Sequence, residues 1–168
     1  MRDLLKFMNG FVDGYGYAGV ISAAEVPKIE VATREFNAAG MAGPIEVRMA
    51  RLANALMAKL TFEGFDPHLY ETLDITEGAL IPFTIKGSTE DGDGATHAHN
   101  IKMRGFLKVL DEGEWKDGEG VPLKLDMSLR YYKRERDGVE LFEIDQENMV
   151  FRVRDNDLLA QHRTNIAR

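Results

Sequence analysis

Apolar and polar residues alternate along much of the chain, so that every second side chain is apolar. The longest such run covers residues 121–132. Its apolar face is expected to carry Val121, Leu123, Leu125, Met127, Leu129 and Tyr131, with Tyr132 on the polar face. Because successive side chains of a strand point to opposite sides of a sheet, this pattern predicts a strand that is buried on one face.

Shorter runs repeat the pattern elsewhere. They are Ile45/Val47/Met49, Leu56/Ala58/Leu60/Phe62, Ile81/Phe83/Ile85, Ile101/Met103/Leu107/Val109 and Met149/Phe151/Val153. Dipeptides typical of hairpin turns separate several runs, namely Asp13-Gly14, Asp117-Gly118 and Asp137-Gly138. The acidic, glycine-rich stretch at residues 90–94 predicts a solvated loop.

Two segments carry the signals of short helices. Asp66 followed by Pro67 is typical of a helix start, because aspartate caps the first turn and proline suits the first helical position. Residues 155–157 form a second candidate cap, for a C-terminal helix running from Leu158 to Ile166. We therefore expect a mainly β fold, an antiparallel sandwich or barrel with one or two short helices, in a single domain over residues 1–168.

The strands predicted near residues 101–110 and 121–133 are long, since a typical strand has about 5–6 residues. A small domain has difficulty covering both edges of such strands. Unpaired edges invite pairing with another chain, so we expect a subunit that completes its sheet with its neighbours.

The composition is that of a folded protein without thiol chemistry: 44% of the 168 residues are hydrophobic, 29% are charged and none is cysteine. The start of the chain has no long apolar run and no stretch could cross a bilayer, so neither a signal peptide nor a membrane anchor is expected. The net charge of −7 disfavours a protein that grips nucleic acid. It suits plain solubility, or a surface past which DNA slides.

Several short motifs suggest chemistry but lack its context. Residues 14–19 match G-x-G-x-x-G without the following helix that a dinucleotide site needs, so a glycine-bearing hairpin is expected there. Residues 91–94 resemble the start of a calcium loop, but Thr96 and Lys102 stand where glycine and glutamate are required. His97 and His99 share a strand face without a third metal ligand nearby.

Clustered charges are expected to be solvated. Asp111, Glu112 and Glu114 fall on a turn rather than in a pocket, which disfavours a carboxylate pair for hydrolysis. The basic stretches at residues 133–136 and 152–154 are short, and a solvated strand end or a docking patch fits them better than a nucleic-acid site. We therefore expect no enzyme activity, no cofactor and no metal.

Short stretches over nearly the whole chain follow an order known from one family. They are residues 8–14 and 17–19, 26–29, 38–44, 103–105 with Lys108, 111–119, 131–133, 137–141, 143–145 with Asn148, and 157–166. In this order the chain resembles the major tail tube proteins of contractile-tailed phages, whose close relatives are the tube proteins of R-type bacteriocins.

The resemblance implies a structural subunit of a virion tail or an extracellular phage-like particle, assembled in the host cytoplasm. Hexameric rings would share an inner β-barrel and stack into a tube for DNA ejection or membrane puncture. The implied partners are further copies of the chain, the tail sheath protein, baseplate or tube-initiator proteins, the tape-measure protein and the tail terminator. DNA would be only a passing cargo.

Ring stacking needs a projecting element, and Gly40 and Gly43 allow unusual backbone angles in such a segment. Residues 33–44 fit a flexible surface loop equally well on pattern alone, but the resemblance favours a stacking role. The stacking candidates are Thr33, Arg34, Glu35, Phe36, Asn37, Gly40, Met41, Gly43 and Pro44. The candidates for an acidic tube wall are Glu46, Glu63 and Asp126.

Two other classes compete with this interpretation. A tube subunit of another injection machine, such as type VI secretion or a non-contractile tail, would share the fold, but the sequence resembles those less. A monomeric β-sandwich that binds a carbohydrate or peptide would show a concave aromatic site, whereas the aromatic residues here are scattered.

Overall fold

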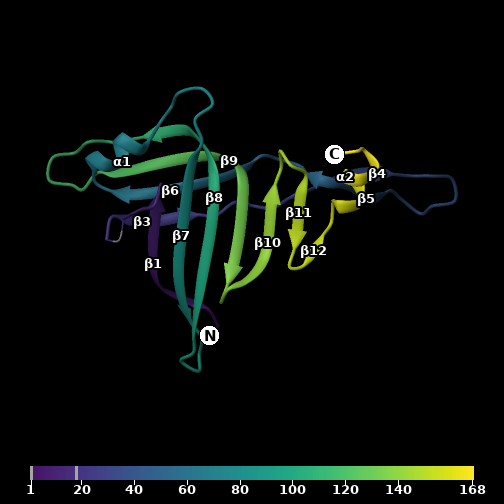
Figure 1. Cartoon of the computed structure of the whole chain (residues 1–168), viewed down its shortest axis with the longest axis horizontal. Helices are drawn as coiled ribbons and strands as arrows, with labels where there is room; N and C mark the ends of the chain where they lie inside the picture. The colour runs from purple at the N-terminus through teal and green to yellow at the C-terminus, as the bar shows by residue number, and fades with distance from the viewer. Residues whose placement is uncertain (1, 18) are drawn as a thin grey trace.

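The computed structural model of the chain describes residues 2–17 and 19–168, and this part is dominated by antiparallel strands (Figure 1). The strands are β1 (Leu4–Val12), β2 (Tyr15–Gly16), β3 (Ile21–Glu25), β4 (Val31–Phe36), β5 (Ile45–Leu52), β6 (Leu56–Glu63), β7 (Ile81–Glu90), β8 (Thr96–Asp111), β9 (Pro122–Arg136), β10 (Val139–Asp145), β11 (Val150–Val153) and β12 (Asn156–Asp157). The helices of this part are α1 (Pro67–Thr72) and α2 (Ala160–Asn165). The expected mainly β class with two short helices is confirmed.

Ten of these strands form one continuous sheet. Eight follow the order β12-β11-β10-β9-β8-β7-β1-β2, and β6 and β3 branch from β9. The first part of β9, residues 122–129, pairs with β6, and residues 131–136 pair with β10. In Figure 1, β3 and β6 run across the direction of β1, β7 and β10. The sheet therefore bends back on itself in the middle of β9.

The bend encloses one hydrophobic core. Leu56, Ala58, Leu60 and Phe62 of β6 are at most 1% exposed, as the alternation predicts. They belong to the same buried cluster as Ile81, Phe83 and Ile85 of β7. Burying a large apolar side chain stabilises a fold by about 1.5–3 kcal/mol, so this cluster holds the two layers together.

Two bulges on the longest strands shift the pattern that the sequence predicts. In the β8–β9 ladder, Arg104 faces Tyr131 but Gly105 faces Leu129, which leaves Arg130 as an extra residue. An extra residue reverses the alternation beyond it. Tyr132, not Tyr131, therefore enters the core, and the expected placement of this pair is wrong.

The second bulge lies on β8. Leu107 faces Met127 and Val109 faces Asp126, so Lys108 is the extra residue. Val109 is consequently 43% exposed instead of lying on the buried face, which corrects its expected placement. At the other end of the sheet, Met149 is not in a strand but precedes β11 with a φ of 53°.

The hairpin signals hold at two of three positions. Asp137 and Gly138 have φ values of 50° and 78° and join β9 to β10, and Asp13-Gly14 joins β1 to β2 in the same way. Both central residues of this tight turn need positive φ, which glycine and aspartate tolerate. Asp117-Gly118 instead lies within the longer connection of residues 112–121 between β8 and β9.

The first predicted helix is confirmed and the second is shorter than predicted. The Asp66 side chain accepts a hydrogen bond from the His68 backbone N–H, at 2.9 Å, and Pro67 opens α1. Asn156 and Asp157 form β12 rather than a cap, and Leu159 precedes α2 without a side-chain cap. The Asp157 carboxylate accepts hydrogen bonds from the Leu159 N–H and from the Arg163 guanidinium.

Candidate assembly surfaces

The β4–β5 hairpin extends from the body of the molecule as a separate two-stranded sheet (Figure 1). Thr33, Arg34, Glu35 and Phe36 lie in β4, whereas Asn37, Gly40, Met41, Gly43 and Pro44 lie in the connection to β5. The tip turns at Gly40, whose φ is 88°, and the Met41 N–H donates to the Ala38 carbonyl at 3.2 Å. The structure thus places the nine stacking candidates on one projection, four in β4 and five in the connection at its tip.

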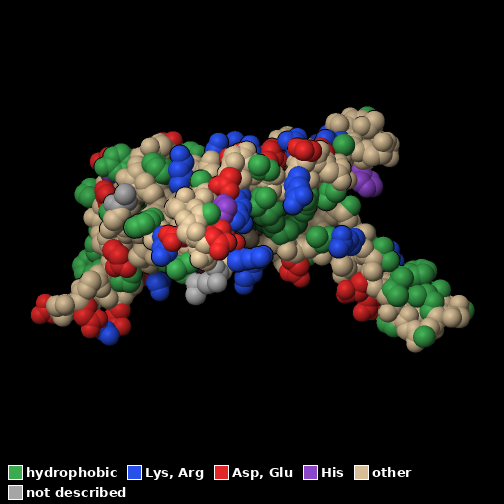
Figure 2. Space-filling view, turned by 90° about the horizontal axis from the view of Figure 1, so that it is seen from below, with side chains coloured by type: hydrophobic (Ala, Val, Ile, Leu, Met, Phe, Trp, Pro, Cys, Tyr) green, Lys and Arg blue, Asp and Glu red, His purple; other side chains and the backbone are tan. Residues whose placement is uncertain are grey.

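One face of this hairpin is apolar and open to solvent. Phe36, Ile45 and Val47 are 54%, 51% and 46% exposed. Figure 2 shows the apolar tip as one of two projections on the same side of the molecule. A two-stranded ribbon is at best marginally stable alone in water, so a partner surface over this face would stabilise it.

The opposite face of the hairpin carries two carboxylates at adjacent positions. Glu35 and Glu46 are direct cross-strand partners. The hydroxyl of Thr33 donates to Glu46 at 3.4 Å, but no salt bridge in the described part of the chain involves either carboxylate. Like charges directly opposite each other destabilise a strand pair, which makes this face a candidate for a cationic partner.

The three candidates for the tube wall are not brought together. Glu63 and Asp126 share the outer face of the β6–β9 ladder, where Glu63 faces Pro122 and Asp126 faces Lys59. Lys59 and Lys124 alternate with them, so this face carries both signs of charge. Glu46 lies on the separate hairpin sheet.

The long strands are more fully paired than the sequence suggested. β9 has a neighbour on both sides along nearly its whole length, so the expectation of an open edge there is wrong. On β8 the expectation holds in part. Residues 106–111 pair with β9 alone, and no second partner strand occurs among the described residues.

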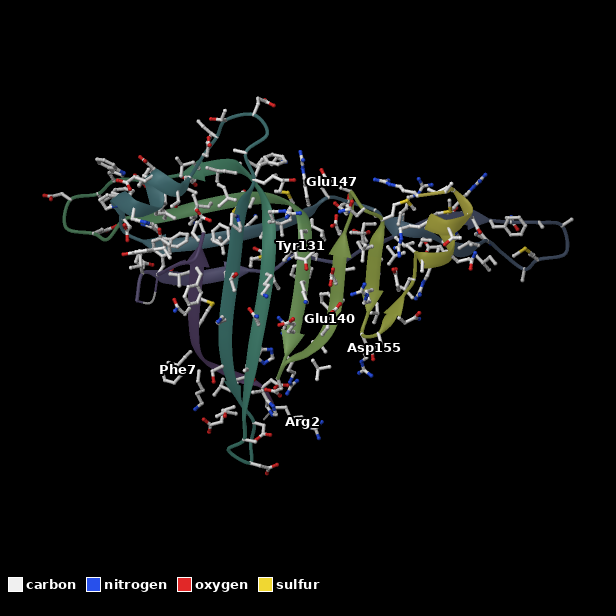
Figure 3. All side chains as sticks on the ribbon, in the orientation of Figure 1. Arg2, Phe7, Tyr131, Glu140, Glu147 and Asp155 are labelled. Carbon is white, nitrogen blue, oxygen red and sulfur yellow. The ribbon has the colours of Figure 1, made fainter. Side chains whose placement is uncertain are left out.

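The most apolar open edge belongs to β1, whose first residues the alternation pattern did not assign to a strand. β1 pairs with β7 along its length. Among the described residues, β2 covers the other side of β1 at Phe11 and Val12, and the Tyr17 N–H adds a hydrogen bond to the Gly10 carbonyl. Leu5 and Phe7 are 55% and 77% exposed, and Phe7 points away from the sheet in Figure 3. The signal that could have indicated this strand is the apolar start of the chain around a single lysine, Lys6.

The two histidines on β8 have separate partners. The His97 ring lies 2.8 Å from Asp137 and 3.6 Å from Asp91, and the hydrogen bond to Asp137 raises the pKa of His97. His99 contacts Thr89 at 2.9 Å and Arg134 at 3.1 Å, and burial together with the nearby guanidinium lowers its pKa. Within residues 2–17 and 19–168, no group of three or more potential ligands could hold a metal ion.

The basic end of β9 is matched by carboxylates. Lys133 lies 3.1 Å from Glu135, and Arg152 lies 3.5 Å from Glu143 and 3.8 Å from Glu140. Glu140 lies over the middle strands of the sheet in Figure 3. This pairing favours a solvated strand end over a patch that binds nucleic acid.

Of the predicted acidic cluster, Asp111 ends β8, and Glu112 and Glu114 lie on the β8–β9 connection, at the acidic projection of Figure 2. Glu112 accepts a hydrogen bond from the Tyr70 hydroxyl at 2.8 Å, and burial and this carboxylate raise the pKa of Tyr70 to about 12. The Trp115 ring centroid lies 5.5 Å from that of Phe65. These contacts tie the connection to α1 and its preceding turn, which is a structural role.

The glycine motif also has a structural role. Gly14 and Gly16 belong to the β1–β2 hairpin, and β3 follows in place of the helix that a dinucleotide site requires. Ala18 of this motif lies outside the described residues. Neither helix of the described part is long and apolar enough to span a bilayer.

Comparison with known proteins identifies the family of the chain. The family model for phage tail tube protein FII matches residues 2–166. The tail tube protein of Escherichia phage P2 is 37% identical over 164 residues, covering 96% of this chain and 95% of that protein. The major tail tube protein of Serratia phage KSP20 is 28% identical over 148 residues, covering 88% and 85%. The chain therefore belongs to the phage tail tube protein FII family, which makes it a structural component of a virion tail and not an enzyme.

Proposed function

We propose that the chain, as one tube domain over residues 1–168, forms hexameric rings that stack into the inner tube of a contractile tail or of a phage-derived injection particle. The tube is the conduit for DNA ejection or membrane puncture. Its partners are other copies of the chain, the sheath protein, baseplate or initiator proteins, the tape-measure protein and the tail terminator. DNA passes through as cargo.

The observation that carries the proposal is the open, apolar edge of β1. Before Gly10, its outward backbone groups have no strand partner among the described residues and can pair with another strand. Its exposed side chains, such as Phe7, would be buried by that strand. A ring needs two different edges per copy, because each contact is head-to-tail. Residues 106–111 of β8 offer a second unpaired stretch, with Phe106 and Leu110 39% and 42% exposed.

Stacking of one ring on the next falls to the β4–β5 hairpin. It projects beyond the body and exposes an apolar face that a neighbouring ring would cover. The residues assigned to this contact are Thr33, Arg34, Glu35, Phe36, Asn37, Gly40, Met41, Gly43 and Pro44.

The tube wall includes acidic side chains, for which Glu46, Glu63 and Asp126 remain the candidates. A negative wall repels the phosphates of DNA and keeps a passing molecule from adhering. The lysines beside Glu63 and Asp126 reduce this effect locally, so the sign of the wall depends on the sum over all copies in a ring.

Deletion of residues 37–43 tests the proposal. The sheet and core do not include these residues, so the variant should keep the thermal unfolding and circular dichroism of a folded β protein. Electron microscopy of the intact chain should show hollow tubes, and the variant should give rings or single subunits that do not lengthen. Tubes of normal length from the variant would refute the stacking role, and a monomeric intact chain at high concentration would refute tube assembly itself.

A further inference from the structure

An apolar groove opens at the end of the molecule that carries the N-terminus. Residues of β1, β7, β8 and β9 line one side of the groove, and Ala24 of β3 and Val26 just after β3 line the other. The volume of the groove is about 370 Å³. The apolar side chains that line the groove are Leu5, Met8, Ala24, Val26, Ile85 and Ile101. Leu5 and Val26 at its mouth are 55% and 38% exposed, so the groove is open to a partner.

The far wall of the groove carries two arginines and one carboxylate, Asp3. Arg134 and Arg136 project from β9, while His99 and Thr89 lie between them and the apolar wall. Arg136 is paired with Asp3 at 2.9 Å. Arg134 donates to the Nδ1 atom of His99 at 3.1 Å, and no carboxylate in the described part of the chain forms a salt bridge with it.

The β4–β5 hairpin has the complementary composition. One face carries the exposed Phe36, Ile45 and Val47, and the other carries the adjacent Glu35 and Glu46, which have no salt bridge among the described residues. The hairpin's own arginines, Arg34 and Arg48, are not within salt-bridge distance of either glutamate. Arg34 faces Val47 on the first face, and Arg48 lies two residues from Glu46 on the second. The ribbon therefore has a mainly apolar face and a face with two carboxylates and one arginine, which suits a groove with an apolar wall and an arginine-bearing wall.

We propose that the β4–β5 hairpin of one copy inserts into this groove on a copy in the adjacent ring, with Phe36 against Leu5 and Val26, and Glu35 or Glu46 paired with Arg134. The β4–β5 hairpin points away from strands β1, β7, β8 and β9, which line the groove, in Figure 1, so a copy does not fill its own groove. This contact rests on the stacking role proposed above and identifies the receiving surface. It would give the Arg134 guanidinium a carboxylate partner and would relieve the repulsion between the adjacent Glu35 and Glu46.

The chain has no cysteine, which permits a clean disulfide test. In a double variant with Phe36→Cys and Val26→Cys, the two thiols approach each other only between copies if the hairpin occupies the groove. Oxidation of assembled tubes should give a ladder of disulfide-linked oligomers on denaturing, non-reducing gels. The control pairs Phe36→Cys with Ile75→Cys, which is 81% exposed on another loop and should give no ladder.

A charge exchange provides the second arm of the test. Arg134→Glu and Glu46→Arg should each stop tube growth, and their combination should restore it if the two side chains meet across rings. Normal tubes without the ladder, or with a ladder equal to the control, would overturn the groove contact while leaving tube assembly intact. Absence of tubes in the unmodified chain would overturn the proposed function and the groove contact together.

Discussion

Replacement of Gly105 by alanine should destabilise the subunit severely. Gly105 lies where β8 crosses β9 beside the Arg130 bulge. A Cβ atom added there would lie 2.1 Å from the Ser128 carbonyl oxygen and 2.8 Å from the Leu129 Cα. Both are backbone atoms of a strand that is paired on both sides, so neither can move without breaking ladder hydrogen bonds.

The expected loss of stability follows from the kind of atom that the added Cβ would contact. Overpacking of a well-packed core costs roughly 1–3 kcal/mol, and a clash with fixed backbone belongs at the upper end. For a chain of this size, each kcal/mol lowers the melting temperature by roughly 2–4 °C. Gly105→Ala should therefore lower it by about 6–12 °C, since the loss is about 3 kcal/mol.

Gly10→Ala is the matched control. Gly10 is also a buried strand glycine, but its added Cβ would meet only the Cδ1 methyl of Ile21, at 2.8 Å. That methyl is the end of a flexible side chain and can turn aside, so the cost should be about 1 kcal/mol or less. Thermal unfolding followed by circular dichroism, at one protein concentration because assembly shifts the melting temperature, compares the three proteins. A Gly105→Ala protein within about 0.5 kcal/mol of the unmodified chain would refute the argument.

Two further predictions concern assembly and pH. Phe7→Glu places a charge on the open β1 edge and should abolish rings in electron micrographs. The control variant Ile75→Glu, at a site 81% exposed, should assemble normally. If both variants formed rings equally well, β1 would not be part of the ring contact. His97 has a raised folded pKa, so its stabilising contribution is complete below its unfolded pKa of about 6.5 and is lost as pH rises through the folded value. His97→Asn should therefore lower the melting temperature more near pH 6 than near pH 8.5, and an equal loss at both would contradict the pairing with Asp137.

Local alternation predicted the strands whose partners lie within the same chain. The apolar faces of β6 and β7 are buried as expected, because side-chain period and core burial agree along both strands. The α1 start was equally predictable, since Asp66 and Pro67 act on their own turn. These signals depend only on residues that are close together in the sequence.

Features that depend on distant partners could not be predicted. The bulges at Arg130 and Lys108 arise from the match between two strands, and each reverses the pattern beyond it, as Tyr132 and Val109 show. The sequence also identified Ile45 and Val47 as one apolar face, but it could not show that this face is open in the single chain. Pattern alone does not distinguish a face buried in its own core from one that another copy would cover.

The glycines of residues 33–44 indicated a turn, and the family resemblance favoured a projecting segment there. Of the two glycines only Gly40 has a positive φ, and the open β1 edge was missed. Whether a strand lies at an edge depends on the order of strands in the sheet. The sequence of residues 4–10 does not indicate that order. The length of the predicted strand at residues 121–133 suggested an open edge, but β9 is a central strand.

Amide hydrogen exchange along β1 tests most directly whether copies complete one another's sheets. In the described part of a single subunit, most amides of β1 that point away from β7 have no partner strand. These amides should therefore exchange rapidly in the Phe7→Glu protein, which is not expected to assemble. In assembled tubes of the unmodified chain the same amides should become strongly protected. Rapid exchange of these amides in intact tubes would contradict the account.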